Sequence, residues 1–158
     1  MSKILFVCLG NICRSPLAEA IFNAQCTAKE LHHLADSAGT AAYHIGEDPD
    51  IRSIETAQKN DIPISHKARK FIASDFKDFD YVIAMDENNL RDMKSISSVK
   101  PDNLYLLREF DESNNGSMNV PDPYYGGIDG FNLIYDMMSI AIDKLIKFIE
   151  TENRGSKL

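Results

Sequence analysis

The distribution of apolar residues along the chain predicts four strands separated by helices and loops. Short, uninterrupted apolar runs, which are typical of strands buried on both faces, occur at residues 3–8 and 81–85. Weaker apolar runs predict two more strands, at residues 34–38 and 104–107. We expect Gly39 to end the first of these weaker strands.

A helix is expected directly after the first strand. Ser15 and Pro16 favour a helix start, because proline lacks only an N–H group that would be unpaired there. Apolar residues then recur every three to four positions, which is the spacing of one helix face. These residues are Leu17, Ile21, Ala24, Ala28 and Leu31. We therefore expect this helix to pack that face against the sheet.

The remaining chain predicts further helices and one long loop. Helices are expected over residues 50–60, as a short element over residues 67–72, and after Asp86, which is a good N-cap. Residues 111–127 are rich in Asp, Asn, Gly, Ser and Pro, which predicts a long loop of the kind that is often functional. The final helix has apolar residues at helical spacing: Phe131, Ile134, Met138, Ala141, Leu145 and Phe148.

This alternation of elements is typical of a doubly wound α/β fold, here a three-layer sandwich with a central four-stranded parallel sheet. The 158 residues contain no internal repeat, no low-complexity tract and no obvious linker, so we expect one domain over residues 1–158. Ligands of such folds bind outside the carboxyl ends of the strands, and Cys8 falls at such an end.

Composition and charge narrow the possible functions. The net charge of −7 argues against a general nucleic-acid binder and against docking on anionic lipid. The apolar run at the N-terminus is too short for a signal peptide, and no segment approaches a membrane span. Three cysteines, an odd number, do not make a disulfide framework, so we expect a cytoplasmic location. Because the cysteines and histidines lack zinc-ligand spacing and no nucleotide-binding glycine motif occurs, we expect no metal and no cofactor.

The segment Cys-Leu-Gly-Asn-Ile-Cys-Arg-Ser-Pro at residues 8–16 carries the chemistry. A loop between a strand and a helix turns backbone N–H groups inward and forms an anion site with the positive helix end. Arg14 adds a fork that can hold two phosphate oxygens, and Cys8 lies beneath the phosphorus, in a field that favours the thiolate. Ser15 can donate a hydrogen bond to that sulfur, and Gly10 would allow close backbone approach or a positive φ. A chance pair of buried thiol and surface arginine is the alternative, but the context favours a cysteine phosphatase.

On these residues the chain resembles the low-molecular-weight protein tyrosine phosphatases over nearly its whole length. The segments that match are residues 7–16, 36–40, 66–69, 79–81, 85–90 and 122–125. The resemblance implies the phosphotyrosine protein phosphatase I-like fold and hydrolysis of phosphotyrosine, and of small aryl phosphates, through a cysteinyl phosphate. It makes Cys8 the nucleophile, Arg14 the phosphate clamp and Asp122 the general acid and base.

The resemblance also implies supporting roles for other residues. Phosphate would be bound by Leu9, Gly10, Asn11, Ile12, Cys13, Arg14 and Ser15. A polar network would hold the loop in shape, formed by Asn11, Ser15, Ser37 and His66. The substrate pocket would be walled by Leu9, Ile12, Tyr43, Tyr124 and Tyr125. For Tyr125, packing of the loop is an equal alternative.

Two further residues have competing interpretations. An acid such as Asp122 would protonate the leaving group, which is worth roughly 10²–10⁴-fold, and Pro121 and Pro123 would stiffen its approach. Without the Cys8 loop, an ordinary turn aspartate would be the better interpretation. Cys13 either packs beneath the loop or, as the family resemblance favours, captures an oxidised Cys8 as a disulfide.

Three other functions are weighed against this one. Arsenate reductases of the same fold use further cysteines in the middle of the chain, but none follows Cys26 here. Protein arginine phosphatases of similar sequence carry threonine where Ile12 offers only an apolar wall. A non-catalytic phosphotyrosine-binding module would be expected to lack the nucleophile or the acid. As partners we expect phosphotyrosine-containing proteins, no nucleic acid and no membrane, with the protein a monomer or a weak homodimer.

Overall fold

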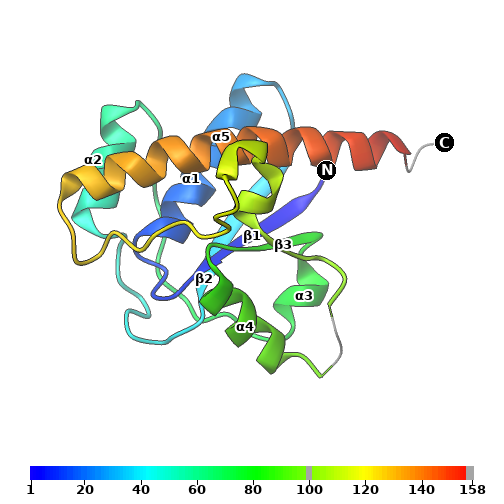
Figure 1. Cartoon of the computed structure of the whole chain (residues 1–158), viewed down its shortest axis with the longest axis horizontal. Coiled ribbons are helices and arrows are strands. Elements are labelled where there is room, and N and C mark those ends of the chain that lie inside the picture. The colour runs from blue at the N-terminus through cyan, green and yellow to red at the C-terminus, as the bar shows by residue number, and fades with distance from the viewer. Residues whose placement is uncertain (99–100, 156–158) are drawn as a thin grey trace.

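A central parallel sheet organises the chain (Figure 1). A computed structural model describes residues 1–98 and 101–155. Within these residues the strands are β1 (Lys3–Cys8), β2 (Leu34–Gly39), β3 (Tyr81–Ala84) and β4 (Leu104–Leu106). Their order in the sheet is β2-β1-β3-β4, and the three pairings are parallel. The four predicted strands are confirmed, although β2 includes Gly39, and β3 and β4 each end one residue earlier than predicted.

Helices cover both faces of the sheet, which confirms the doubly wound three-layer arrangement. On one face lie α1 (Arg14–Ala28), α2 (Ile51–Lys59) and α5 (Ile128–Gly155), and on the other α3 (Asp75–Asp78) and α4 (Glu87–Ile96). Two short 3₁₀ turns, Leu107–Phe110 and Glu112–Asn114, lead from β4 into the long loop before α5. Among the described helices, none is both long and apolar enough to cross a bilayer.

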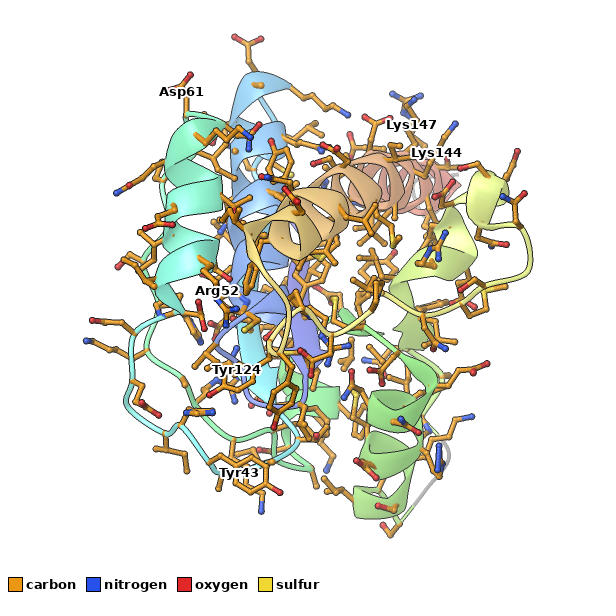
Figure 2. All side chains as sticks on the ribbon, turned by 60° about the vertical axis from the view of Figure 1, so that its left-hand side comes forward. Tyr43, Arg52, Asp61, Tyr124, Lys144 and Lys147 are labelled. Carbon is orange, nitrogen blue, oxygen red and sulfur yellow. The ribbon has the colours of Figure 1, made fainter. Side chains whose placement is uncertain are left out.

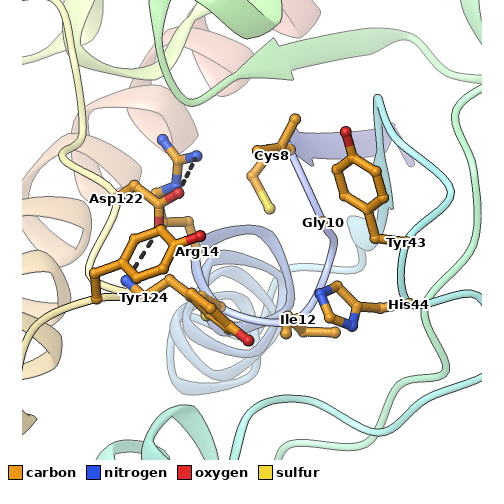
Figure 3. A pocket seen from close by; sticks show the side chains of 11 residues that line it. Cys8, Gly10, Ile12, Arg14, Tyr43, His44, Asp122 and Tyr124 are labelled. Carbon is orange, nitrogen blue, oxygen red and sulfur yellow. Dashed lines mark hydrogen bonds and ion pairs between the residues drawn. The ribbon is translucent and has the colours of Figure 1, made fainter.

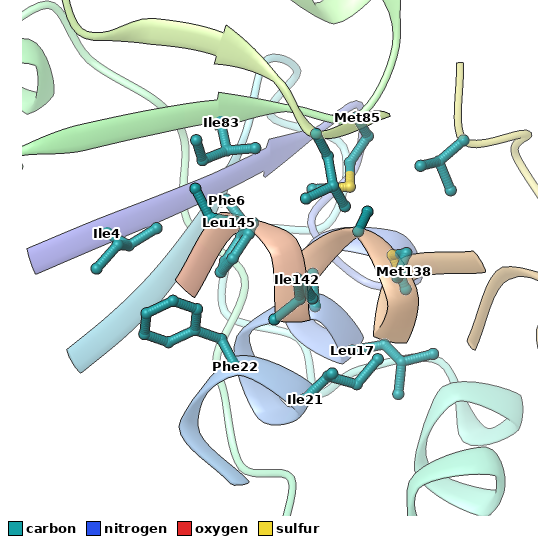
Figure 4. Close-up of a cluster of buried hydrophobic side chains, with 14 of the residues drawn as sticks. Ile4, Phe6, Leu17, Ile21, Phe22, Ile83, Met85, Met138, Ile142 and Leu145 are labelled. Atoms are coloured by element: carbon teal, nitrogen blue, oxygen red, sulfur yellow. The ribbon is translucent and has the colours of Figure 1, made fainter. Parts of the chain in front are cut away.

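The position of β1 inside the sheet explains why its residues 4–8 are apolar without interruption. Successive side chains of a strand point to opposite faces, and here both faces are covered. Ile4 and Phe6 belong to the larger buried cluster, which Figure 4 shows between the sheet and helices α1 and α5. Leu5 and Val7 belong to the smaller cluster beneath α3 and α4. A strand with one wet face would have alternated apolar and polar residues instead.

The buried face predicted for α1 is partly wrong. Leu17 and Ile21 are buried as expected, but Ala28 is exposed and ends the helix, and Leu31 lies beyond it. The helix is enclosed by β2, α2 and α5 together, so its buried side is wider than one stripe. It also includes Ala18, Ala20, Phe22 and Cys26.

Residues 67–72 do not form the predicted short helix. The segment is extended and forms a parallel bridge with the end of β2. The N–H of Gly39 donates to the carbonyl of Arg69 at 2.9 Å, and the N–H of Phe71 donates to the carbonyl of Gly39 at 2.7 Å. Because Phe71 is also buried in the smaller cluster, these long-range contacts outweigh the local helical tendency.

Candidate active site

The loop of residues 8–15 follows β1, at the point where the order of strands in the sheet reverses. From β1 the chain builds β2 on one side, and β3 lies on the other side. Ligands of doubly wound folds bind at this switch point, outside the carboxyl ends of the strands. The carbonyl oxygens of Cys8, Leu9 and Ile12 accept hydrogen bonds of 2.7–2.9 Å from N–H groups just after β2 and just before α2. The loop therefore directs these carbonyls toward the surrounding elements.

A pocket of about 200 Å³ opens over this loop (Figure 3). It brings together the three residues predicted to be catalytic, Cys8, Arg14 and Asp122. The predicted wall residues also line it: Leu9, Ile12, Tyr43, Tyr124 and Tyr125. Gly10, Cys13 and His44 complete the lining.

Two of the predicted phosphate-binding residues do not line the pocket. Asn11 and Ser15 are buried behind the loop, where their side chains bind other side chains. Their side-chain contacts fit the second role predicted for them, which is support of the loop.

Arg14 is buried at the base of the pocket and is held by fixed partners. Its Nη1 donates to Asp86 Oδ2 at 2.6 Å and to the carbonyl of Val120 at 2.9 Å. Its Nη2 lies 3.7 Å from Asp122 Oδ2. Burial alone would lower the pKa of Arg14, but the negative charges of Cys8, Asp86 and Asp122 outweigh burial and raise this pKa above its ordinary value. Arg14 is therefore a permanent cation in the pocket.

Asp86 uses its two carboxylate oxygens for two different structures. Oδ1 accepts the N–H of Asn89 at 2.7 Å, which confirms the predicted N-cap of α4. Oδ2 binds Arg14, a role that the sequence analysis missed. One signal for it was available. Asp86 follows β3, the neighbour of β1, and the carboxyl ends of adjacent parallel strands meet at one edge of a sheet.

The residues predicted to support the loop lie together behind it. Asn11 Nδ2 donates to Ser15 Oγ at 2.8 Å and to Ser37 Oγ at 3.0 Å. Asn11 Oδ1 lies 2.7 Å from His66 Nε2. Ser15 Oγ lies 3.0 Å from Cys8 Sγ. The network therefore runs from His66 through Asn11 and Ser15 to the sulfur.

The backbone of the loop depends on Asn11 and Gly39 more than on Gly10. Asn11 has a φ of 58°, so it, and not Gly10, is the left-handed residue of the loop. At Gly39 a Cβ atom would lie 2.8 Å from the carbonyl oxygen of Leu9 and 3.1 Å from the nitrogen of Asn11. Only glycine at this position lets the loop approach the end of β2 so closely.

The other nitrogen of His66 faces two carboxylates. Asn11 Oδ1 also accepts the N–H of Arg69 at 3.0 Å, so it is an acceptor and His66 Nε2 donates to it. His66 Nδ1 lies 3.2 Å from Glu19 Oε1 and 3.6 Å from Asp36 Oδ1. In the described part of the chain, these three side chains place donor atoms within 4.8 Å of one another and could hold a metal ion. The sequence analysis missed this cluster because its members are scattered along the chain.

Asp122 lies across the pocket from Tyr43, with Cys8 between them (Figure 3). Its side chain is 41% exposed, and its Oδ1 accepts the N–H of Tyr124 at 3.0 Å. Tyr125 is 95% exposed, and its ring meets the ring of Tyr124 edge-on at 5.0 Å. Tyr125 therefore buries little of its surface against the loop and lies at the pocket mouth.

The three cysteines are free and buried. Burial raises the pKa of the Cys13 thiol far above its ordinary value, and nearby Asp50 and Cys8 raise it further. Cys26 belongs to the larger apolar cluster, as expected, and burial raises its pKa to about 11. Cys13 and Cys26 are therefore neutral thiols at neutral pH, unlike the thiolates that act as nucleophiles.

Comparisons with known proteins agree with this geometry. A protein of Schizosaccharomyces pombe named low molecular weight phosphotyrosine protein phosphatase is 48% identical over 140 residues, which cover 84% of this chain and 87% of that protein. The crystal structure of a protein tyrosine phosphatase from Entamoeba histolytica with Hepes in the active site has a TM-score of 0.91 and 35% identity, covering 97% of this chain and 99% of that one.

An arginine phosphatase of Drosophila is also similar in structure, with a TM-score of 0.86 and 30% identity, covering 94% of this chain and 98% of that one. The family model for low molecular weight phosphotyrosine protein phosphatase matches residues 3–155. That match spans the whole sheet, the loop after β1 and the late loop that carries Asp122, so the chain belongs to the low molecular weight phosphotyrosine protein phosphatase family.

Proposed function

We propose that this protein hydrolyses phosphotyrosine in proteins through a phosphate bound covalently to Cys8. The proposal is supported above all by the meeting, in one pocket, of a cysteine, a buried arginine and an aspartate from a distant loop. Each of the three has a separate task in the transfer of a phosphoryl group to sulfur and then to water.

The loop binds the phosphate. The carbonyls of residues 8, 9 and 12 accept hydrogen bonds from the surrounding elements, and in the proposed complex the N–H groups of residues 9–14 bind phosphate oxygens. Arg14 is held by Asp86 through Nη1, so the remaining edge of its guanidinium is available to two oxygens. Phosphate bound in this way is centred over Cys8 Sγ.

The chemistry then proceeds in two displacements at phosphorus. In the first, Cys8 Sγ attacks, the S–P bond forms, the P–O bond to tyrosine breaks, and Asp122 gives its proton to the leaving phenolate oxygen. In the second, water attacks phosphorus, Asp122 takes the proton of that water, and the S–P bond breaks to release phosphate and the thiolate. The hydroxyl of Ser15, 3.0 Å from the sulfur, stabilises the anion before attack and after release.

The pocket walls favour an aromatic substrate. Leu9 and Ile12 supply apolar surface, and the rings of Tyr43 and Tyr124 border the opening above Cys8. A phosphotyrosine ring can extend from the loop to these walls, whereas the shorter phosphoserine would leave them without contact.

The covalent intermediate gives the most direct test. We expect that acid quenching of a reaction with p-nitrophenyl phosphate, within milliseconds, followed by peptide mapping, finds phosphate on Cys8. The buried thiols of Cys13 and Cys26 serve as internal controls and remain unmodified. Turnover without an adduct on Cys8 would overturn the mechanism.

Protein arginine phosphatase activity is a second candidate, because an arginine phosphatase of Drosophila shares the fold. A phosphoguanidinium in the pocket would need a hydrogen-bond partner, but Ile12, 8% exposed in the pocket wall, offers only carbon. We expect turnover of phosphotyrosine peptides to exceed that of matched phosphoarginine peptides by at least tenfold. Ile12→Thr supplies a hydroxyl and is expected to shift the ratio toward phosphoarginine by about tenfold. A wild-type preference for phosphoarginine would replace phosphotyrosine as the proposed substrate.

Arsenate reduction is a weaker alternative. A reductase of this fold needs further thiols to carry away oxidising equivalents, and no cysteine follows Cys26 in the sequence. Hydrolysis of a phosphate ester uses Cys8, Arg14 and Asp122 and needs no further thiol.

A further inference from the structure

Arg52 does not line the pocket, but its side chain binds Asp50 before α2 and the loop that carries Asp122. It sits in the first turn of α2, and Figure 2 shows it next to Tyr124. Its guanidinium is half-buried between α2 and the loop that carries Asp122. No step of the proposed reaction uses it.

The loop that carries Asp122 is fixed on its N-terminal side by the sheet and by Arg14. The N–H of Val120 donates to the carbonyl of Met85 at 2.9 Å, and the carbonyl of Val120 accepts from Arg14 Nη1 at 2.9 Å. Asp122 lies two residues beyond this anchor, and its side chain is 41% exposed. An aspartate in such a position keeps a constant place only if the loop is also held on its other side.

Arg52 provides that second anchor. Its Nη2 donates to the carbonyl of Tyr124 at 2.9 Å, and its Nη1 donates to the carbonyl of Gly126 at 2.7 Å. These carbonyls belong to the turn in which Gly126 N–H binds the carbonyl of Pro123 at 3.0 Å. The N–H of Tyr124 in turn holds Asp122 Oδ1 at 3.0 Å. One guanidinium is thus connected to the carboxylate of Asp122 through a single residue.

The guanidinium is itself bound on several sides. Asp50 Oδ1 accepts from Arg52 Nε and Asp50 Oδ2 accepts from Arg52 Nη2, both at 3.0 Å. The hydrogen bond with Arg52 is the main cause that lowers the pKa of Asp50. The guanidinium carbon lies 4.6 Å from the ring centre of buried Phe131 and 5.8 Å from that of Tyr124. A side chain bound on this many sides has little freedom to move.

The same turn of α2 also holds the phosphate loop. The N–H of Asp50 donates to the carbonyl of Ile12 at 2.7 Å, and Ser53 Oγ donates to the carbonyl of Cys13 at 3.0 Å. Asp50 and Arg52 therefore connect the loop of residues 8–15, which is the phosphate loop, with the loop that carries Asp122, which is the acid loop.

We propose that Arg52 is a positioning residue that, through Tyr124 and Gly126, sets the distance between the Asp122 carboxyl and the leaving-group oxygen. The inference rests on the proposed function, since it takes Asp122 to be the general acid. A misplaced acid slows proton transfer to the leaving group but leaves phosphate binding and attack by sulfur in place. Arg52 thus supports one catalytic step and not the site as a whole.

The dependence of kcat/KM on the leaving group tests this role. Arg52→Met is expected to lower kcat/KM about tenfold for phenyl phosphate, whose leaving group needs protonation, and less than threefold for p-nitrophenyl phosphate. Arg52→Lys keeps the charge but has three donors on one nitrogen in place of the four hydrogen bonds that Arg52 donates from three nitrogens, so it is expected to restore only part of the loss. Inhibition by inorganic phosphate is expected to change less than twofold in both variants. Arg91→Met, which removes an exposed arginine of α4, is the matched control and is expected to leave both substrates unaffected.

A double-variant comparison separates this proposal from the one on which it rests. In an Asp122→Asn background, Arg52→Met is expected to cause no further loss on phenyl phosphate, because there is no acid left to position. Equal losses on both substrates, a full additional loss in that background, or a large change in phosphate inhibition would overturn the role of Arg52. If Asp122→Asn lowers kcat/KM equally for phenyl phosphate and p-nitrophenyl phosphate, Asp122 is not the general acid. The role proposed for Arg52 then fails with it. The adduct on Cys8 is measured separately and reports on the covalent mechanism alone.

Discussion

A Cys8→Ser protein is expected to turn over aryl phosphates at least about 10⁴-fold more slowly than the wild type while it still binds oxyanions. A serine hydroxyl is a weak nucleophile unless a base takes its proton. The group next to the sulfur is the Ser15 hydroxyl at 3.0 Å, which is not a base. Arg14 and the loop backbone are unchanged by the substitution, so the anion site remains.

Steady-state turnover of p-nitrophenyl phosphate and calorimetric binding of inorganic phosphate together check this prediction. Cys26→Ala, which alters a buried cysteine of the apolar core, is the matched control and is expected to keep its turnover. Turnover by Cys8→Ser within tenfold of the wild type would contradict the assignment of the nucleophile. Loss of phosphate binding would show instead that the loop had changed shape.

Arg14→Lys is expected to lower kcat/KM by about 10³-fold, the second large effect. One side of the Arg14 guanidinium binds Asp86 and the carbonyl of Val120, and the other side faces the pocket. An ammonium group cannot hold a carboxylate and two phosphate oxygens in one plane, and the 2.6 Å contact of Asp86 with Arg14 shows where it would be drawn. Stabilisation of the equatorial oxygens in the transition state is therefore lost.

The measurement is kcat/KM for p-nitrophenyl phosphate, together with inhibition by inorganic phosphate, which is expected to weaken in parallel. Arg91→Lys makes the same change on the exposed surface of α4 and is expected to leave both quantities unaltered. Full activity of Arg14→Lys would show that positive charge is sufficient and that the planar fork is not required.

Much of this fold could be predicted because its signals are local. Residues 4–8 are apolar without interruption since both faces of β1 are covered, and that pattern identifies a central strand from sequence alone. The nucleophile and the clamp are equally local, since Cys8 and Arg14 lie on one short loop. Asp122 was named through a family resemblance, because a turn aspartate between prolines carries no signal of its own.

The features that were missed depend on contacts between distant segments. Residues 67–72 are extended because Gly39 and the buried ring of Phe71 hold them, which no local propensity reveals. Arg52 meets the acid loop more than seventy positions later in the chain. Glu19 faces His66 in a similar way. Charged residues of this kind are interpreted as solvated surface until the fold places a partner against them.

The two carboxylate oxygens of Asp86 link the capping of α4 with the binding of an anion by Arg14. One oxygen suppresses fraying at the start of α4, and the other orients the guanidinium that receives the anion. An occupant that fixes the guanidinium therefore also favours the capped helix, and by thermodynamic reciprocity an intact helix favours the occupant. Capping of α4 and binding of the anion are therefore expected to be coupled through Asp86.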